Sequence, residues 1–210
     1  MAWAPDYVTE DELAAFVEVE DVRDDVPMGL AIAAASRAID RTTRRQFGRV
    51  DAPEARFYTA RWDDLRARWV VPIDDLMDDA GLEIAFDEDE DETYGAPITV
   101  HALRPVNAAQ KGRPWEDLVV PPRSAVQPTT LDAGVKVTAR WGWTEVPTAV
   151  KEACLLQASR VLKRRHAPFG VAGSPEAGSE VRLLAKVDPD VEVALAGYKR
   201  GAGRGGAVFA

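Results

Sequence analysis

The chain has a single cysteine, Cys154, among its 210 residues. One thiol cannot form an internal disulfide framework, which excludes the small disulfide-stapled secreted domains and suits a reducing cytoplasm. There is no run of about 18 apolar residues, so the sequence predicts no membrane-spanning helix. The first residues, MAWAPDYVTEDEL, carry acids where a signal peptide has a basic and then an apolar region. We therefore expect a soluble protein made in the cytoplasm.

Patterns that indicate catalysis are also scarce. The two histidines, His101 and His166, stand far apart without further ligands at metal-binding spacing, and one cysteine cannot complete a zinc cluster. Gly201, Gly203 and Gly206 spell GxGxxG, but a dinucleotide site needs a strand before this motif and a helix after it. No nucleophile elbow and no Walker loop occur. The sequence predicts no catalytic residue, no cofactor and no metal site.

Positive charge is in the minority, with 26 Lys and Arg against 35 Asp and Glu and a net charge of −9. This balance argues against an affinity of the whole protein for nucleic acid. The distribution is uneven: Asp74–Glu92 holds eleven acids and no base, whereas the last fourteen residues hold three bases and no acid. Two partner surfaces of opposite charge are one interpretation, and solvated faces that differ by chance are the other.

The densest acidic run is Asp87–Glu92, with the sequence DEDEDE. Its alternate aspartates imitate the first ligands of an EF-hand loop, but Glu92 occupies the glycine position and Ile98 the position of the bidentate glutamate. Six adjacent carboxylates repel one another, so we expect a solvated, flexible loop. Two-metal chemistry requires rigidly placed carboxylates. The alternative function among enzymes is therefore a small metal-dependent nuclease that uses the acids of Asp74–Glu92.

Helical periodicity occurs in the N-terminal part. Thr9 and Glu12 match a capping box, which predicts a helix from about residue 9 to 20. Pro27 is placed to open a second helix, and Gly48 is a natural stop for it. The apolar face predicted for this second helix consists of Leu30, Ala31, Ala34, Ala35, Ala38 and Ile39.

Helix is predicted again after Pro147. Residues at helical spacing form one apolar stripe, namely Val150, Ala153, Cys154, Ala158, Val161 and Leu162. A final short helix follows Asp188–Pro189 and carries Val191, Val193 and Leu195. The apolar stripes either form the core of the subunit itself or contact a neighbouring copy.

Between the helices, short runs rich in β-branched and aromatic residues predict strands at 56–61, 68–73, 82–86, 98–103 and 135–141. The stretches 87–95 and 104–122 are expected to be long loops. The sequence thus predicts an α+β fold, in which helices of residues 1–49 and 144–198 form a helical core. This core is interrupted by an antiparallel β insertion of residues 50–143 and followed by an extended, flexible tail of residues 199–210.

The order of these parts resembles the head–tail connector proteins of long-tailed bacteriophages, also called head-completion or adaptor proteins. The resemblance is carried by residues 28–48 (MGLAIAAASRAIDRTTRRQFG), 71–76 (VPIDDL), 103–107 (LRPVN), 135–170 with WGW and QASRVLKRRHAPFG, and 188–200 (DPDVEVALAGYKR). The resemblance spans most of the chain. It depends on the order and spacing of these motifs, since no single motif is specific. The β insertion and its acidic loop are longer than in the smallest members of the family.

The resemblance implies a virion protein and not an enzyme. Such proteins form a ring of twelve copies beneath the portal, at the neck of the virion, after assembly in the host cytoplasm. The ring extends the DNA channel used in genome ejection, binds no specific DNA sequence and docks stopper or tail-completion proteins. Another ring of the neck or tail, a stopper or a terminator, is the alternative, although those are mostly β-barrels.

Two partner-binding regions follow as hypotheses. The first is a portal-binding arm that would become ordered on the portal and bury its aromatic residue, with Tyr198, Lys199, Arg200, Arg204, Val208 and Phe209. The alternative is a tail that binds nothing. The second region comprises the acids Asp87, Glu88, Asp89, Glu90, Asp91 and Glu92. These acids either line the channel, where carboxylates repel phosphates, or face outward, or meet a tail protein.

Overall fold

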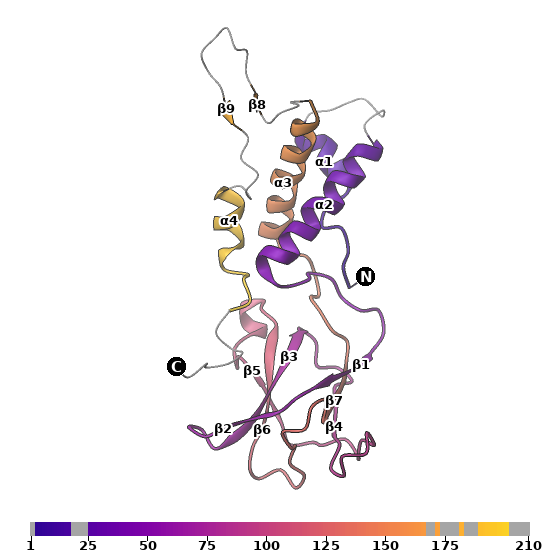
Figure 1. The fold of residues 1–210 in the computed structure, drawn as a ribbon, viewed down its shortest axis with the longest axis vertical. Coiled ribbons are helices and arrows are strands. Elements are labelled where there is room, and N and C mark those ends of the chain that lie inside the picture. The colour runs from indigo at the N-terminus through magenta and orange to yellow at the C-terminus, as the bar shows by residue number, and fades with distance from the viewer. Residues whose placement is uncertain (1–2, 18–24, 167–170, 173–180, 183–188, 202–210) are drawn as a thin grey trace. The chain divides into compact units, whose positions relative to one another are not determined.

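The structure, a computed structural model, describes residues 3–17, 25–166, 171–172, 181–182 and 189–201 (Figure 1). The chain divides into two compact units. Residues 1–4 and 48–145 form the first, here called the β unit, and residues 5–47 and 146–210 form the second, the helical unit. Helices and antiparallel sheets are both present, which confirms the predicted α+β fold class.

The helical unit is built around α3 (Thr148–His166), which packs against α1 (Glu10–Val17), α2 (Asp25–Thr43) and α4 (Pro189–Ala196) (Figure 1). The predicted capping box of α1 is confirmed: the Thr9 N–H donates to Glu12 Oε2 at 2.8 Å, and the Glu12 N–H donates to Thr9 Oγ1 at 3.1 Å. The bond from the Thr9 backbone lowers the pKa of the Glu12 carboxyl. The local sequence thus fixes where the first helix begins.

The buried face of α2 differs from the predicted one. The side chains that enter the core are Met28, Ala31, Ile32, Ala35 and Ile39. Leu30 is 69% exposed and Ala34 is exposed, so the prediction was wrong for these two residues. The alanines of α2 are small and occur on more than one side of the helix, so they do not by themselves decide between two neighbouring faces. The larger Met28 and Ile32 decide between them, because they bury more area.

The stripe predicted for α3 is confirmed at its centre, where Val150, Ala153, Cys154 and Ala158 are fully buried. Val161 and Leu162 are only partly buried. The predicted final helix is α4 and it carries all three apolar residues, of which Val191 and Leu195 are buried while Val193 is 77% exposed. Residues two apart in a helix point about 200° apart, so Val193 cannot share the face of its neighbours.

The β unit contains two antiparallel sheets. In the first, β7 (Val135–Ala139) lies between β1 (Glu54–Tyr58) and β4 (Glu83–Phe86). The second has the order β2-β3-β6-β5, formed by β2 (Arg61–Asp63), β3 (Arg68–Leu76), β6 (Trp115–Val120) and β5 (Ala102–Arg104) (Figure 1). A further short pair, β8 (Val171–Ala172) and β9 (Val181–Arg182), belongs to the helical unit.

Two features of this sheet arrangement differ from the predicted strands. The run predicted as one strand at 56–61 is divided between β1 and β2, which belong to different sheets. The strand β6 was missed, because it lies within the stretch predicted to be a long loop at 104–122. Glu116 and Asp117 interrupt its apolar pattern, yet Asp117 is buried. A charged residue on a central strand hides the alternation on which a strand prediction depends.

Side chains from both sheets meet in one hydrophobic core, whose fully buried members include Val71, Ile73, Leu76, Ile84, Leu118, Val120, Val135, Val137 and Trp141. The members come from β3, β4, β6 and β7 and from the residues that follow β7. Because β1 leads directly into β2, the chain passes from one sheet to the other around this core.

The WGW motif, Trp141–Trp143, follows β7 at a point where three chain segments meet. The Gly142 N–H donates to the Asp75 carbonyl at 2.7 Å, and the Trp143 N–H donates to the Gly48 carbonyl at 2.8 Å. Both indoles are buried, and the Trp143 Nε1–H donates to Asp75 Oδ2 at 2.8 Å. Gly142 has φ 107°, and a Cβ at this position would lie 2.0 Å from the Gly48 carbonyl oxygen. Glycine is therefore required here both by conformation and by space.

Replacing Gly142 with Ala tests this crossing. The new methyl group would collide with backbone that has no flexible side chain to yield, so we expect a loss of about 3 kcal/mol or more in the free energy of unfolding in urea. Gly81→Ala is the matched control, because Gly81 also has a positive φ of 75° but nothing within 4 Å of the added Cβ. That variant should lose about 1–2 kcal/mol from conformation alone. Equal losses in the two variants would contradict the close approach at Gly142.

Candidate functional site

The segment that follows α4 is fixed to the C-terminal end of α2 within the helical unit. The Arg200 N–H donates to the Thr43 carbonyl at 2.8 Å, and the Arg45 Nε–H donates to the Tyr198 carbonyl at 2.7 Å. The Tyr198 ring packs edge-on against Phe47, with ring centroids 5.9 Å apart. We call Tyr198–Arg200 the tail root, because the glycine-rich end of the sequence follows it directly.

The end of α2 explains why the tail root binds there. The last four carbonyls of a helix have no partner within the helix. Arg44, with a left-handed φ of 56°, ends α2 and leaves the Thr43 carbonyl available to the Arg200 N–H. The predicted helix end at Gly48 was therefore about five residues too late.

The predicted portal-binding residues are placed in two groups. Tyr198 and Arg200 are partly buried and their backbones are anchored, whereas Lys199 between them is exposed. Arg204, Val208 and Phe209 lie outside the described residues. Of the predicted set, the first three residues thus form an anchor from which the rest of the tail continues, and their binding to a partner stays a prediction.

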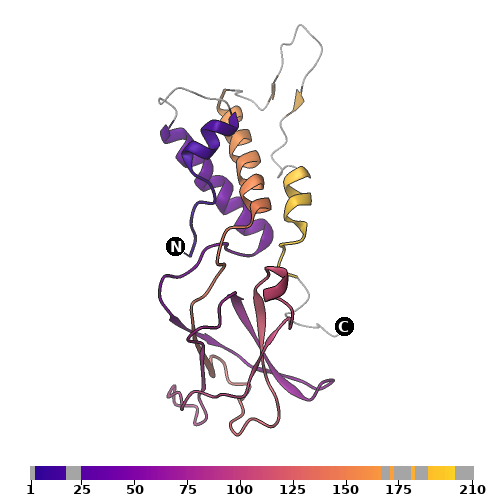
Figure 2. The ribbon, with the colours of Figure 1, turned by 180° about the vertical axis from the view of Figure 1, so that it is seen from behind.

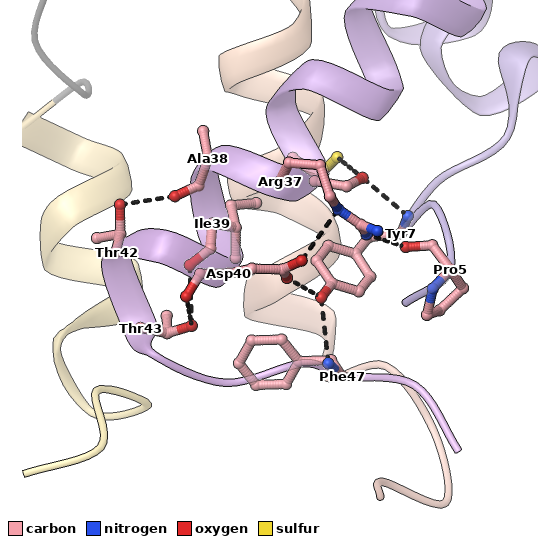
Figure 3. Close-up of polar contacts among 11 residues, drawn as sticks. Pro5, Tyr7, Arg37, Ala38, Ile39, Asp40, Thr42, Thr43 and Phe47 are labelled. Carbon is pink, nitrogen blue, oxygen red and sulfur yellow. Dashed lines mark hydrogen bonds and ion pairs between the residues drawn. The ribbon is translucent and has the colours of Figure 1, made fainter. Parts of the chain in front are cut away.

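A buried polar network secures the N-terminal segment at the same end of α2 (Figure 3). The Tyr7 hydroxyl donates to the Asp40 carboxylate and accepts the Phe47 N–H at 3.1 Å, while the Tyr7 N–H donates to Ser36 Oγ at 3.2 Å. The Arg37 guanidinium forms an ion pair with Asp40 at 3.0 Å and donates to the Pro5 carbonyl at 2.6 Å. Every member except Pro5 and Tyr7 comes from α2 or the residues after it.

Phe47 joins these two anchors. Its ring packs edge-on against Tyr7 on one side, with centroids 5.7 Å apart, and edge-on against Tyr198 on the other. Edge-to-face pairs of this kind contribute about 0.5–1.5 kcal/mol beyond the area they bury. The segment before α1 and the segment after α4 are therefore both held by the residues that end α2. Sequence periodicity could not reveal this, because none of the three aromatic residues lies in the apolar stripe of a helix.

Burial determines the protonation of this network. It raises the pKa of the Tyr7 hydroxyl far above its ordinary value, so this group remains a hydrogen-bond donor. Burial also raises the pKa of the Asp40 carboxyl, and the bond from Tyr7 opposes that rise. The nearby Cys154 thiol lies 3.5 Å from Ser36 Oγ, and burial raises its pKa to about 11. A protonated, buried thiol is a poor nucleophile, so Cys154 acts here as a core residue.

The second predicted region, the acidic run, forms a closed loop between two paired residues, Asp87 and Tyr94. Asp87 is buried and its carboxylate accepts the Glu92 N–H at 2.9 Å and the Asp91 N–H at 3.3 Å. The five acids from Glu88 to Glu92 are exposed, as predicted for a solvated loop. The expectation of a solvated loop was wrong for Asp87, whose buried carboxylate accepts two N–H groups of the loop.

Tyr94 fixes the acidic loop to the outer face of the first sheet. Its hydroxyl donates to the Ala133 carbonyl at 2.7 Å, and its ring lies 5.4 Å from that of Phe57 on β1. The Lys136 ammonium of β7 lies 5.6 Å from the centre of the same ring. The result is a defined surface, which we call the loop face, with Phe57, Tyr94 and the acids Glu88–Glu92. The role of Tyr94 was not predicted from the sequence, although an aromatic residue directly after a run of acids could have indicated that the loop is attached there.

Within the described residues, no three His, Cys, Asp or Glu side chains are grouped so that they could hold a metal ion. No helix among these residues is long and apolar enough to cross a membrane. Comparison of the chain with protein-family models and with curated proteins finds no match.

The Tyr7 hydroxyl can be tested by Tyr7→Phe, which removes the acceptor of the Phe47 N–H and leaves the Asp40 carboxylate with its ion pair to Arg37 alone. We expect a loss of about 1–3 kcal/mol in the free energy of urea unfolding at neutral pH. The pKa of the Asp40 carboxyl is raised in the folded protein, so the free energy of unfolding decreases as the pH rises through that pKa. The hydrogen bond from Tyr7 lowers this pKa and therefore makes the decrease smaller. The loss caused by Tyr7→Phe should therefore be larger at pH 7 than at about pH 3.

Asp40→Asn provides the control for this test, since it removes the titrating group. In that background, the cost of Tyr7→Phe should no longer depend on pH. A cost that has the same pH dependence with and without Asp40 would contradict the role assigned to the carboxylate.

The support of the acidic loop can be tested by Asp87→Ala. Without the buried carboxylate, the amides of Asp91 and Glu92 lose their acceptor, and their hydrogen exchange should accelerate by about tenfold or more. Asp89→Ala is the matched control, because Asp89 is exposed and the same charge is removed from the same loop. Equal acceleration in both variants would show that repulsion between the acids, and not the Asp87 bonds, governs the opening of the loop.

Proposed function

We propose that this chain is a structural subunit of a bacteriophage neck, a head–tail adaptor that forms a ring between the portal and the tail. The ring extends the DNA channel and docks stopper or tail proteins. The observation that carries the proposal is the anchored tail root, where Arg200 and Tyr198 are bound to the end of α2. The basic sequence GAGRGGAVFA thereby continues from a defined place on a folded helical unit.

An anchored root favours binding by a tail. Ordering a chain segment on a partner costs backbone entropy for every residue that becomes fixed, about 1–2 kcal/mol for each. Because Tyr198 and Arg200 are already bound to the end of α2, their ordering adds nothing to this cost. Glycines allow close approach of the arm to a partner backbone, and Phe209 supplies an aromatic group of the kind that dominates the energy of binding interfaces.

The charge of the two units supports a role beside passing DNA. The β unit, residues 1–4 and 48–145, contains 19 Asp and Glu against 11 Lys and Arg, whereas the helical unit contains 16 against 15. The negative excess of the chain is thus concentrated in the β unit. A component of a DNA channel must not bind the phosphate backbone tightly. Proteins bind DNA by neutralising its phosphates with basic side chains, so an acidic surface lets DNA pass without retaining it.

A stopper or terminator ring is the alternative within the same structural class, and a metal-dependent nuclease is the alternative among enzymes. The α+β fold, with four helices in the described part of the chain, disfavours the first, because such rings are mostly β-barrels. Cleavage of DNA by the purified chain that requires Mg²⁺ would favour the nuclease. Co-purification with a portal protein would favour the adaptor.

The role of the tail can be tested by a chain that ends at Arg200. Its thermal midpoint should equal that of the full chain, because the bonds to Thr43 and Arg45 remain, but it should no longer co-purify with the portal. Phe209→Ala in the full chain should weaken docking about 30-fold, the effect of an aromatic anchor worth roughly 2 kcal/mol. Val193→Ala, which also shortens an apolar side chain, is the control and should dock normally. Undiminished docking of the shortened chain would overturn the proposed arm.

A further inference from the structure

The hairpin of β2 and β3 presents an apolar tip to solvent. Leu65 in its turn is 86% exposed, and Trp62 on β2 is 40% exposed. Trp62 stands opposite Trp69 in the strand register, and the two indoles pack edge-on with centroids 5.3 Å apart. Large apolar side chains gathered on one exposed feature indicate an interaction surface.

The hairpin is built to hold this tip in place. Trp69 packs partly against the core of the β unit, which fixes the base of the hairpin. The Arg66 N–H donates to the Asp63 carbonyl at 3.2 Å, and the Asp63 carboxylate pairs with Arg66 at 3.3 Å and with Arg68 at 3.6 Å. A partner would therefore bind a preorganised surface, which lowers the entropic cost of binding.

The hairpin also differs in charge from the rest of its unit. Residues 61–68 contain three Arg and two Asp, a small positive excess in a unit with 19 acids against 11 bases. The Arg66 side chain is mostly exposed despite its ion pair. The hairpin thus combines tryptophan with arginine, two residue types that are enriched in protein interfaces.

The loop face has the complementary composition and lies at the other end of the same unit. It combines the exposed Phe57, which is 52% exposed, with Tyr94 and the acids Glu88–Glu92. The hairpin belongs to β2, at the edge of the second sheet, and the loop follows β4, at the edge of the first. Figures 1 and 2 place β2 and the turn after it on the side of the β unit opposite to β4.

We propose that the hairpin of one copy docks on the loop face of a second copy of this chain. Trp62 and Leu65 would pack on Phe57 and Tyr94, while the arginines of the hairpin face the carboxylates of Glu88–Glu92. The occupant is a second copy because the two surfaces are complementary: the hairpin has a small positive excess, the loop face has five exposed acids, and both present exposed apolar side chains that can pack together. Charge complementarity of this kind selects and orients a partner.

This contact has a geometric consequence. The two surfaces are different and lie on opposite sides of one unit, so the contact is heterologous, and every bound copy retains one unused hairpin or one unused loop face. Such contacts repeat from copy to copy until they close into a ring. The inference names the subunit contact of the proposed ring; it rests on that ring assembly but not on recognition of a portal.

A mixing experiment with full-length protein tests the contact. The hairpin variant carries Trp62→Ser and Leu65→Ser, and the loop variant carries Glu88→Lys, Asp89→Lys and Glu90→Lys. Each should remain a monomer in analytical ultracentrifugation at concentrations where the unmodified chain associates. An equimolar mixture should form dimers of one variant with the other and nothing longer, because only one intact pair of surfaces remains. Val193→Ser, at an exposed site of the helical unit, should associate normally.

Disulfide trapping detects the same contact when association is weak. Leu65→Cys in one protein and Glu90→Cys in another should give cross-linked dimers between the two proteins, about tenfold in excess over cross-links of either protein with itself. The native Cys154 is fully buried and will not compete. Cross-linking no greater than that of a Val193→Cys control would overturn the inference, even where the unmodified chain shows no association in ultracentrifugation.

The remaining outcomes separate this inference from the proposed function. A loop variant that assembles normally in virions but slows genome ejection would overturn the contact and place the acids in the channel. A hairpin variant that associates normally but loses a tail protein would overturn it as well and assign the hairpin to that protein. Mixed dimers without any co-purification of portal would support the contact while the adaptor role fails.

Discussion

The β unit depends on the close approach of Gly142 to the backbone of Gly48 and Arg49. The chain enters this unit at residue 48 and leaves it at residue 145, and the crossing holds the entry and the exit side by side. Asp75 stabilises the crossing from β3, because its carbonyl and its carboxylate accept N–H groups from Gly142 and Trp143. A unit whose entry and exit are joined in this way can be inserted into another fold without separating the flanking segments.

Much of the architecture could be predicted from local patterns, and the failures have identifiable causes. The capping box at Thr9 and the buried centre of the α3 stripe were found because each depends on residues within a few positions of one another. The face of α2 was misplaced because alanines define a face weakly, and β6 was missed because Asp117 is buried in a strand. In both cases, tertiary packing outweighs the local signal.

The candidate sites show the same limit more strongly. The composition of the tail and of the acidic run marked both as partner-binding regions, but nothing local could indicate that the end of α2 anchors Tyr198 and Arg200 or that Tyr94 holds the acidic loop. These contacts join residues that are far apart in the sequence: Arg45 and Tyr198, for example, are separated by 153 positions. The exposed tip at Leu65 likewise could not be identified as a surface without the strand register that places Trp62 opposite Trp69.

The division of the chain also sets the order in which its parts can fold during synthesis. All but four residues of the β unit are contiguous, so this unit can fold as soon as residue 145 has left the ribosome. The apolar face of α2, with Met28, Ile32 and Ile39, cannot be covered until Val150 and Ala153 of α3 have been synthesised. At ordinary rates of synthesis this wait lasts roughly 5 to 20 seconds. During that time the first helices carry an uncovered apolar surface that chaperones can bind.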